Sequence, residues 1–349
     1  MTTMRLRFPS LYAPFVRVGL AAALVACGDP ERAPTVPAPT TISPVAVAYL
    51  EEVVTLLQRH SVKRRTIDWT AFRAEVMAAA GPAQTISETV PGIRRALALL
   101  GDGHSVYIPL RGSAVSVPTR SCHAPTIGRS GGTPNVGYVR VRNFSGPPAE
   151  ATLYAQRIQD SIRVTDRDGI VGWIVDLRGN AGGNMWPMIA GIGPILGEGV
   201  VGHFLDADST FTPYSYRDGA SASGDTPLHQ VSSVYRLKRP NPRVAVLTDG
   251  WVASSGEAVA IAFRERPDTR SFGTATCGLS TGNTTYWLSD TSRLVITAAT
   301  MADRKRRAYG DVIPPDEVVA NPDDTVSRAI EWLTFATGPA GAVAVVRER

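Results

Sequence analysis

Short apolar runs alternate with periodically apolar segments through most of this chain. Residues 244–247 and 170–177 are apolar on both faces and are bounded by turn residues, which is typical of strands in a covered parallel sheet. Residues 136–144 alternate as a strand does, and residues 149–162 and 185–196 have the periodicity of helices. Strands that alternate with helices predict an α/β fold with a mostly parallel sheet.

A helical segment precedes this α/β pattern. Ser43 and Pro44 suit the N-cap and the first position of a helix, and two more helices follow at short spacing. We expect the three helices at residues 43–59, 68–80 and 88–100. This organisation predicts an N-terminal helical subdomain at residues 43–105, an α/β core at residues 106–336 and a C-terminal tail at residues 337–349.

The second half of the core contains a long polar stretch and a hairpin. Residues 206–232 are rich in Gly, Ser and Asp, which predicts a long loop or a flap over a cleft. Residues 284–288 and 293–300 predict a hairpin that turns at Ser289 and Asp290. We expect the last helix at residues 324–334.

Residues 1–26 have the features of a secretory leader. Three arginines and no acidic residue accompany an apolar stretch that is too short to span a bilayer. The stretch ends in LVAC, which resembles the bacterial lipoprotein signal, in which the cysteine, here Cys27, is lipidated. Gly28 favours anchoring in the outer membrane, and residues 27–42 have the proline-rich composition of a tether. The alternative is an ordinary cleaved leader with an incidental cysteine.

The remaining composition is that of an ordinary globular protein. Of the 349 residues, 44% are hydrophobic and 19% are charged, which is enough apolar material for a sizeable core. Without the three arginines of the leader, the formal net charge falls from +5 to +2, so no nucleic-acid partner is predicted. The one dense basic run, residues 304–307, is interpreted as a solvated turn.

Ser254 is the first candidate for chemistry. It lies between the strand at residues 244–247 and a helix that it can cap. At this place its hydroxyl meets the positive end of the helix dipole, and the free N–H of Ser255 can face a developing oxyanion. The simpler interpretation is that Ser254 only caps the helix.

Four motifs follow one another along the chain: LGDGHS at residues 100–105, VDLRGNAGG at 175–183, ASSGE at 253–257 and IPPD at 313–316. Together, in this order and spacing, they resemble the S41 serine peptidases, the tail-specific and tricorn-like proteases. The resemblance implies a ClpP/crotonase-like β-α spiral core and a nucleophilic role for Ser254, with Ser255 as its rival by adjacency. Many tail-specific relatives carry a PDZ domain, for which residues 109–135 are too few.

The resemblance also implies a base for the nucleophile, because a serine hydroxyl needs one within hydrogen-bond reach. Tail-specific members use a lysine, but Leu279 occupies that position here. Tricorn-like members use a histidine, and His104 in GDGHS occupies the corresponding place, where a neutral imidazole suits proton transfer. His104 can also be a structural histidine of a glycine turn. His60, His123, His203 and His229 belong to no motif and are interpreted as surface or loop residues, and only His123, which adjoins Cys122, is a rival base.

A third group should orient the imidazole. The family's glutamate position falls near Tyr309, so Asp311 is the candidate, with Asp303 and Glu317 as alternatives. Each can equally be an ordinary turn acid. Glu257 is a possible supporting group, although a first-turn helix acid is the simpler interpretation.

The glycine-rich motif predicts the other half of an oxyanion hole. Gly182 and Gly183 are the expected donors, opposite the N–H of Ser255, because glycine lets backbone N–H groups approach a bound carbonyl. The motif lacks the spacing of a dinucleotide-binding loop, and no metal-binding motif is present, so neither a cofactor nor a metal is predicted.

Cys122 and Cys277 are the cysteines that remain after the lipoprotein signal. In an oxidising compartment they favour a disulfide, with two unpaired thiols as the alternative. A bridge would tie the histidine segment to the nucleophile side of the core.

The sequence as a whole predicts a lipid-anchored serine endopeptidase, or carboxy-terminal processing peptidase, of the cell envelope, acting on a protein or peptide. Two alternatives remain open: a non-catalytic binding protein on the same fold, and a crotonase-like hydrolase of small acyl esters.

Overall fold

The computed structural model describes residues 40–124 and 127–335. The predicted leader at residues 1–26, Cys27, most of the tether and the tail at residues 337–349 lie outside the described residues. No helix among the described residues is both long and apolar enough to cross a membrane.

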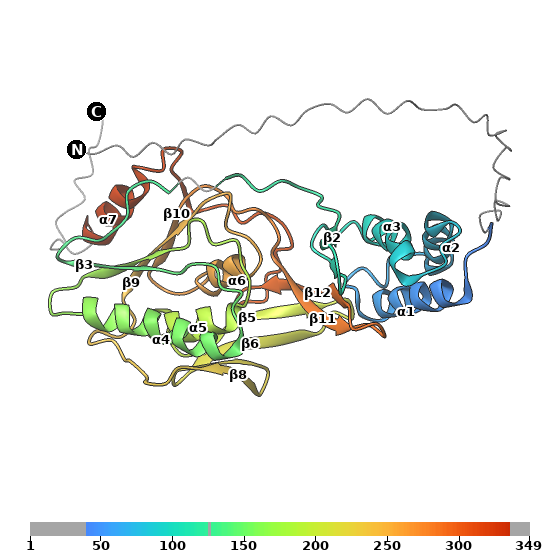
Figure 1. The fold of residues 1–349 in the computed structure, drawn as a ribbon. Coiled ribbons are helices and arrows are strands. Elements are labelled where there is room, and N and C mark those ends of the chain that lie inside the picture. Colours follow the sequence, from blue (N-terminus) through green and yellow to red (C-terminus); the bar gives the residue numbers. More distant parts are fainter. Residues whose placement is uncertain (1–39, 125–126, 336–349) are drawn as a thin grey trace, which may run out of the picture. The chain divides into compact units, whose positions relative to one another are not determined.

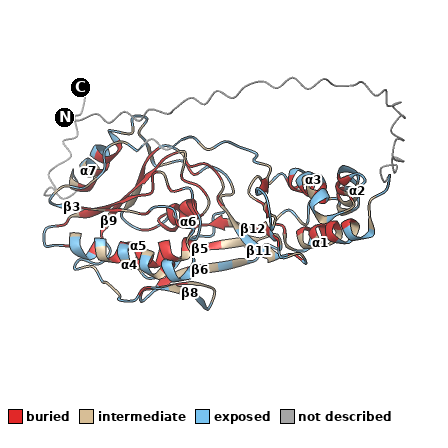
Figure 2. Ribbon diagram, in the orientation of Figure 1, coloured by how far each residue is buried: buried red, intermediate tan, exposed pale blue. Residues whose placement is uncertain are grey.

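A five-stranded, all-parallel sheet forms the centre of the fold, as the alternating pattern predicts. Its order is β13-β10-β9-β4-β3. The strand β4 is buried along its whole length, and β9 is buried after its first residue (Figure 2). The strands are β3 (Val136–Arg140), β4 (Gly172–Asp176), β9 (Arg243–Thr248), β10 (Thr269–Gly273) and β13 (Glu317–Val318).

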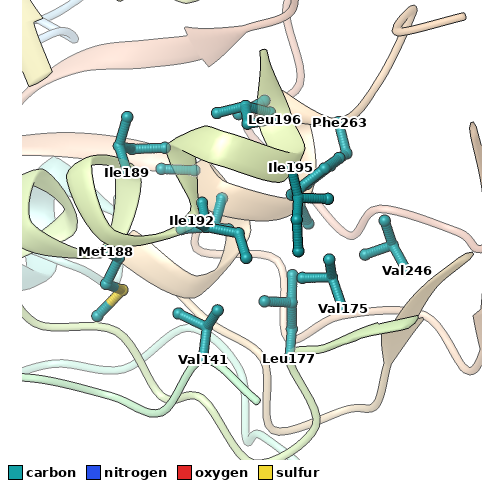
Figure 3. Close-up of a cluster of buried hydrophobic side chains, with 14 of the residues drawn as sticks. Val141, Val175, Leu177, Met188, Ile189, Ile192, Ile195, Leu196, Val246 and Phe263 are labelled. Carbon is teal, nitrogen blue, oxygen red and sulfur yellow. The ribbon is translucent and has the colours of Figure 1, made fainter. Parts of the chain in front are cut away.

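Helices cover both faces of the parallel sheet (Figure 1). The helices are α4 (Pro148–Thr165), α5 (Met185–Leu196), α6 (Ser255–Ala262) and α7 (Thr325–Phe335). Val175 and Val246 pack with Ile192 and the other apolar side chains of the first three helices (Figure 3). Ile174 and Leu247 face the opposite way, toward α7. This alternation of buried side chains is why the strands of the sheet are apolar on both faces.

The fold also contains a second, antiparallel sheet, of which only one hairpin was predicted. It has eight strands in the order β2-β1-β12-β5-β6-β7-β8, with β11 paired to β12. They are β1 (Val106–Ile108), β2 (Val115–Ser116), β5 (Gly199–Asp206), β6 (Phe211–Arg217), β7 (Ala220–Ser223), β8 (Thr226–Gln230), β11 (Thr281–Trp287) and β12 (Arg293–Ala302). The predicted β11–β12 hairpin is confirmed. The predicted long loop at residues 206–232 is wrong, because its polar, partly exposed residues form the strands β6, β7 and β8.

The three predicted N-terminal helices are confirmed as α1 (Pro44–His60), α2 (Trp69–Ala80) and α3 (Val90–Leu100), the last preceded by a 3-10 turn at Ile86–Thr89. The Ser43 hydroxyl accepts the N–H of Ala46 and caps α1. The three helices share a hydrophobic cluster with Leu294 and Ile296 of β12. The helical segment is therefore packed directly on the antiparallel sheet.

Candidate active site

Ser254 occupies a strained turn between β9 and α6. Its φ of +52° and ψ of −118° lie outside the ordinary regions for a residue with a Cβ, and an N-cap residue normally has an extended conformation. Such backbone strain persists only where the surrounding structure enforces it, and it concentrates at functional sites. The turn presents Ser254 to a large cleft of about 1080 Å³.

Glu257 holds this turn in place. Its carboxylate is fully buried and accepts hydrogen bonds from the Ser254 N–H at 2.9 Å, the Gly278 N–H at 2.8 Å and the Thr276 hydroxyl at 2.5 Å. Burial raises its pKa to about 7, and these hydrogen bonds oppose the shift. Glu257 thus joins the turn to the loop after β10, which is more than the ordinary first-turn acid that the sequence suggests.

The glycine-rich loop packs directly against the turn. A Cβ on Gly182 would lie 2.9 Å from the Cβ of Ser254 and 3.0 Å from the backbone nitrogen of Ser255, so only glycine allows this approach. The hydroxyl of Ser255 donates to the carbonyl oxygen of Gly183 at 2.5 Å and fastens the two segments together.

The two glycines differ in what their N–H groups can do. The N–H of Gly182 donates to Oδ1 of Asn180 at 3.0 Å, so it is already engaged. The N–H groups of Gly183 and Ser255 donate to no other group within the described residues, and both residues line the cleft beside Ser254. The geometry therefore leaves Gly183 and Ser255 as the candidate oxyanion donors.

His104 is held in a tight loop by Asp102. Oδ1 of Asp102 accepts the N–H groups of His104 at 2.9 Å and Ser105 at 2.8 Å. The Nδ1 atom of His104 lies 2.7 Å from the hydroxyl of Thr281, a residue that lines the same cleft as Ser254. Burial lowers the pKa of the imidazole below its usual value, and the charge of Asp102 opposes this shift.

None of the three predicted acids contacts this imidazole. Asp311 has a 69% exposed side chain and pairs with Arg120 at 2.5 Å. Asp303 is buried and accepts the hydroxyl of Tyr309 at 3.0 Å, and Glu317 pairs with Arg270 and Arg328. The partner of His104 is instead Thr281, which no motif of the sequence singles out.

The histidines His123 and His203 lie away from the hydroxyl of Thr281 that His104 contacts. His123 is exposed and packs against Gly250, at the start of the turn that leads to Ser254. The interpretation of His203 as a surface or loop residue is wrong, because it is buried in β5 and its Nδ1 lies 2.9 Å from the carbonyl oxygen of Asp303. Within the described part of the chain, neither His123 nor His203 forms a hydrogen bond with Ser254, and His104 does not either; His104 differs from them in that its partner Thr281 lines the same cleft as Ser254.

A disulfide joins Cys122 to Cys277, with a Cα–Cα distance of 5.0 Å. Cys277 directly precedes Gly278, which holds Glu257, and Cys122 belongs to the segment that follows β2. The bridge therefore braces the loop on which the buried carboxylate depends. Among the described residues, no group of three or more His, Cys, Asp or Glu side chains is arranged to hold a metal ion.

The cleft has an apolar side and a polar side. Met185 and Trp186 at the start of α5 face Phe204 of β5 and Met301 of β12. Five consecutive residues of β11, from Thr281 through Thr285, also line it. Side chains on one face of a strand recur at every second residue, so five consecutive lining residues mean that the edge of β11 faces the cleft.

Comparison with known proteins places this site in a family. The model of peptidase family S41 matches residues 135–319, which is more than half of the chain. The nisin-resistance protein of Lactococcus lactis subsp. lactis is 29% identical over 267 residues, 76% of this chain and 80% of that protein. The carboxy-terminal processing protease CtpA of Bacillus subtilis (strain 168) is 27% identical over 165 residues, but the match covers only 30% of its length.

Solved structures share the fold. A lipoprotein from Streptococcus agalactiae superposes with a TM-score of 0.65 at 20% identity, covering 84% of this chain and 98% of that one. The photosystem II D1 C-terminal processing protease gives a TM-score of 0.50 at 16% identity, covering 80% and 94%. Together with the family match, these likenesses show that the chain belongs to peptidase family S41 and has its mixed α/β fold.

Proposed function

We propose that this protein is a serine peptidase of the cell envelope that uses a histidine base and has no PDZ domain. The observation that carries the proposal is the strained conformation of Ser254 at the mouth of the cleft, packed against Gly182 and beside the N–H groups of Gly183 and Ser255. We also propose a ClpP/crotonase-like spiral for the parallel-sheet core, which its consecutive parallel strands support.

In the proposed reaction, the hydroxyl of Thr281 accepts the Nδ1 proton of His104 and leaves the lone pair of Nε2 as the base. Ser254 Oγ attacks the carbonyl carbon of the peptide bond while its proton passes to Nε2. The N–H groups of Gly183 and Ser255 stabilise the oxyanion. The imidazolium then returns the proton to the leaving amine, and water hydrolyses the acyl-enzyme with the same base.

A lowered pKa supports His104 in this role. A base must be neutral before it can accept a proton, and burial keeps the imidazole neutral at and somewhat below neutral pH. Thr281 lies beside the ring without a negative charge, so in the proposed arrangement a hydroxyl orients His104 where other serine peptidases have a carboxylate.

The shape of the cleft supports a peptide substrate in extended form. The edge of β11 that faces the cleft has no strand partner within the described residues, because β11 pairs with β12 alone. An extended peptide can add to such an edge through main-chain hydrogen bonds. The apolar side chains around Trp186 then offer a pocket for an apolar residue next to the cleaved bond.

We place the enzyme outside the cytoplasm, lipidated at Cys27 and facing the periplasm or the cell exterior. The LVAC signal supports this, as does the disulfide, because such bonds persist in oxidising compartments. The relatives that support it are a structure described as a lipoprotein and a protein named for resistance to nisin. Nisin therefore belongs in the substrate panel.

The test is hydrolysis of casein, nisin and unstructured peptides by the full-length protein in detergent. Ser254→Ala and His104→Ala should each lower kcat by roughly 10³-fold or more, while the matched control His123→Ala should retain activity. A fluorophosphonate should label Ser254 in the wild type. Absent labelling together with intact ligand binding would support a non-catalytic protein, and hydrolysis of small esters without any peptide cleavage would support an acyl-ester hydrolase.

A further inference from the structure

We propose that a groove on the N-terminal helical segment binds one anionic phospholipid of the membrane, with its phosphate at Arg94 and Arg111. The groove shares no lining residue with the cleft of Ser254. The inference rests on the part of the proposed function that places the protein at a membrane, and it adds a second contact with lipid to the anchor at Cys27.

The groove has an apolar floor. Its larger hollow, of about 570 Å³, lies between the 3-10 turn at Ile86–Thr89, the start of α3 and the loop at residues 109–114 that joins β1 to β2. The strand β2 lies beside α3 (Figure 1). Tyr107 and Val115 line the hollow and belong to the hydrophobic cluster that the three helices share with β12. A concave, mostly apolar hollow of this size is typical of small-molecule sites and suits an aliphatic chain.

A second hollow adjoins the first. Its volume is about 380 Å³, and the two hollows have Val90 and Arg94 in common. The other residues that line the second hollow are Ala79, Pro91, Arg95 and Ala98. Arg95 is already paired with Glu75, so the cation available at the junction of the hollows is Arg94. A head group bound to Arg94 can direct one chain into each hollow, which favours a lipid with two acyl chains over a single-chain fatty acid.

The charge at the larger hollow selects an anion. Arg94 and Arg111 both line it, both are exposed, and neither makes an ion pair or a side-chain hydrogen bond within the described residues. The carboxylate of Asp290 also lines the hollow, but it already accepts the Tyr49 hydroxyl at 2.9 Å and two donors of Ser292. A guanidinium can hold a phosphate through two parallel hydrogen bonds, and apolar surface combined with positive charge attracts a protein to anionic lipid.

The attachment of the tether identifies the membrane as the source of this lipid. The tether enters the described fold beside the groove, where the N–H and the hydroxyl of Ser43 donate to the carbonyl oxygens of Ala83 and Gln84, both at 2.9 Å. Ile86, which lines the groove, follows two residues later. A lipid at Cys27, sixteen positions before Ser43, would therefore keep the groove near the head groups of the bilayer. An acidic peptide satisfies the same charge requirement but gains nothing from this attachment.

The experiment measures lipid binding by the full-length protein in detergent, with native mass spectrometry to count bound molecules. One molecule of dioleoyl-phosphatidylglycerol should bind, about tenfold or more tightly than dioleoyl-phosphatidylcholine, because the choline offsets the negative charge that the arginines attract. Equal affinity for the two lipids, or no binding of either, would contradict the proposal. Oleate, or an acidic peptide of Leu and Glu residues, that binds as tightly as phosphatidylglycerol would reassign the groove to a fatty acid or to a protein partner and would equally overturn it.

Matched variants locate the site. Arg94→Gln combined with Arg111→Gln should abolish the preference for phosphatidylglycerol, whereas Arg217→Gln, which removes an exposed arginine of β6, should leave it unchanged. Ala114→Trp fills the larger hollow and should weaken the binding of both phospholipids. Thermal melting checks that each variant is folded. A double variant that keeps the preference, or an Ala114→Trp protein that binds as the wild type does, would refute the assignment to this groove.

Failure of this inference can be separated from failure of the proposed function. Every variant carries the same N-terminus, so the anchor cannot produce a difference between them. The mass of the N-terminal peptide tests lipidation at Cys27 independently. Lipidated Cys27 without a preference for phosphatidylglycerol refutes the groove alone, whereas the preference in a protein with unmodified Cys27 supports the groove and refutes the anchor.

Discussion

Replacing Ser254 by Gly and by Ala tests whether the turn is strained. Both substitutions remove the hydroxyl, so both proteins should be inactive, and they differ only in the Cβ. At φ +52° and ψ −118° a Cβ costs about 1–3 kcal/mol, which Gly avoids. Gly loses about 0.4–1 kcal/mol through the greater freedom of the unfolded chain. Ser254→Gly should therefore be more stable than Ser254→Ala by about 0.5–2 kcal/mol.

The assay is urea unfolding of both variants with the disulfide oxidised. Equal slopes of the free energy of unfolding against urea concentration would confirm that the two variants share one unfolded state. Ser87 provides the control, because it is exposed in the 3-10 turn at Ile86–Thr89 and its φ is not positive. There the order should reverse, with Ala more stable than Gly by about 0.5–1 kcal/mol. Equal stability at Ser254, or a more stable Ala variant, would refute the argument that this backbone is held under strain.

Four further sites give predictions of their own. Burial raises the pKa of Glu257 from 4.5 to about 7, so the folded state holds this proton more tightly than the unfolded chain does. The wild type should therefore lose up to about 3 kcal/mol relative to Glu257→Gln as the pH rises from 4.5 through 7, and parallel stability curves would contradict this. Because burial lowers the pKa of His104, this base should reduce kcat/KM only at pH values below about 6.5. The pH profile is measured in Glu257→Gln, because Glu257 has a pKa of about 7 and holds the Ser254 turn; a fall of kcat/KM that begins above about pH 6.5 in that variant would argue against a buried base. Thr281→Val should lower kcat about tenfold or more with little change in KM, whereas Thr281→Ser should keep most of the wild-type kcat. Equal kcat values for the Val and Ser variants would exclude the orienting role of Thr281. Replacing Cys122 and Cys277 together by Ser should cost about 2–5 kcal/mol in urea unfolding, and an unchanged midpoint would show that the bridge does not stabilise the fold.

The parallel sheet was predictable because its strands are buried on both faces. The apolar runs around Val175 and Val246 admit few other interpretations, and the helix between them, α5, is apolar and buried along almost all of its length. The strands β6 to β8 were not predictable in this way. Their residues are small, polar and partly exposed, so the local pattern of residues 206–232 is that of a loop, and only pairing with neighbouring strands makes them a sheet.

The candidate site, too, could be predicted only as far as local pattern determines it. The place of Ser254 between a strand and a helix follows from local pattern, but the partners of its neighbours depend on contacts across the fold. Asp311 stands near the expected position of an acid, yet Arg120, 191 residues earlier, takes its carboxylate. Thr281 reaches His104 across 177 residues, and a threonine in a strand carries no signal that distinguishes it from any other.

The open edge of β11 has a consequence for the behaviour of the protein at high concentration. A strand that leaves its backbone groups available to one extended chain leaves them available to every other, including the same strand of a second molecule. The first half of β11 opposes such self-association, since Gly282 and Asn283 disfavour a regular strand and the segment has no Ile or Val, whereas its Thr, Tyr and Trp residues favour one. The irregular register between Gly282 and Asn283 twists the edge away from a flat template. Sequence changes that make this strand flatter and more apolar should therefore favour aggregation.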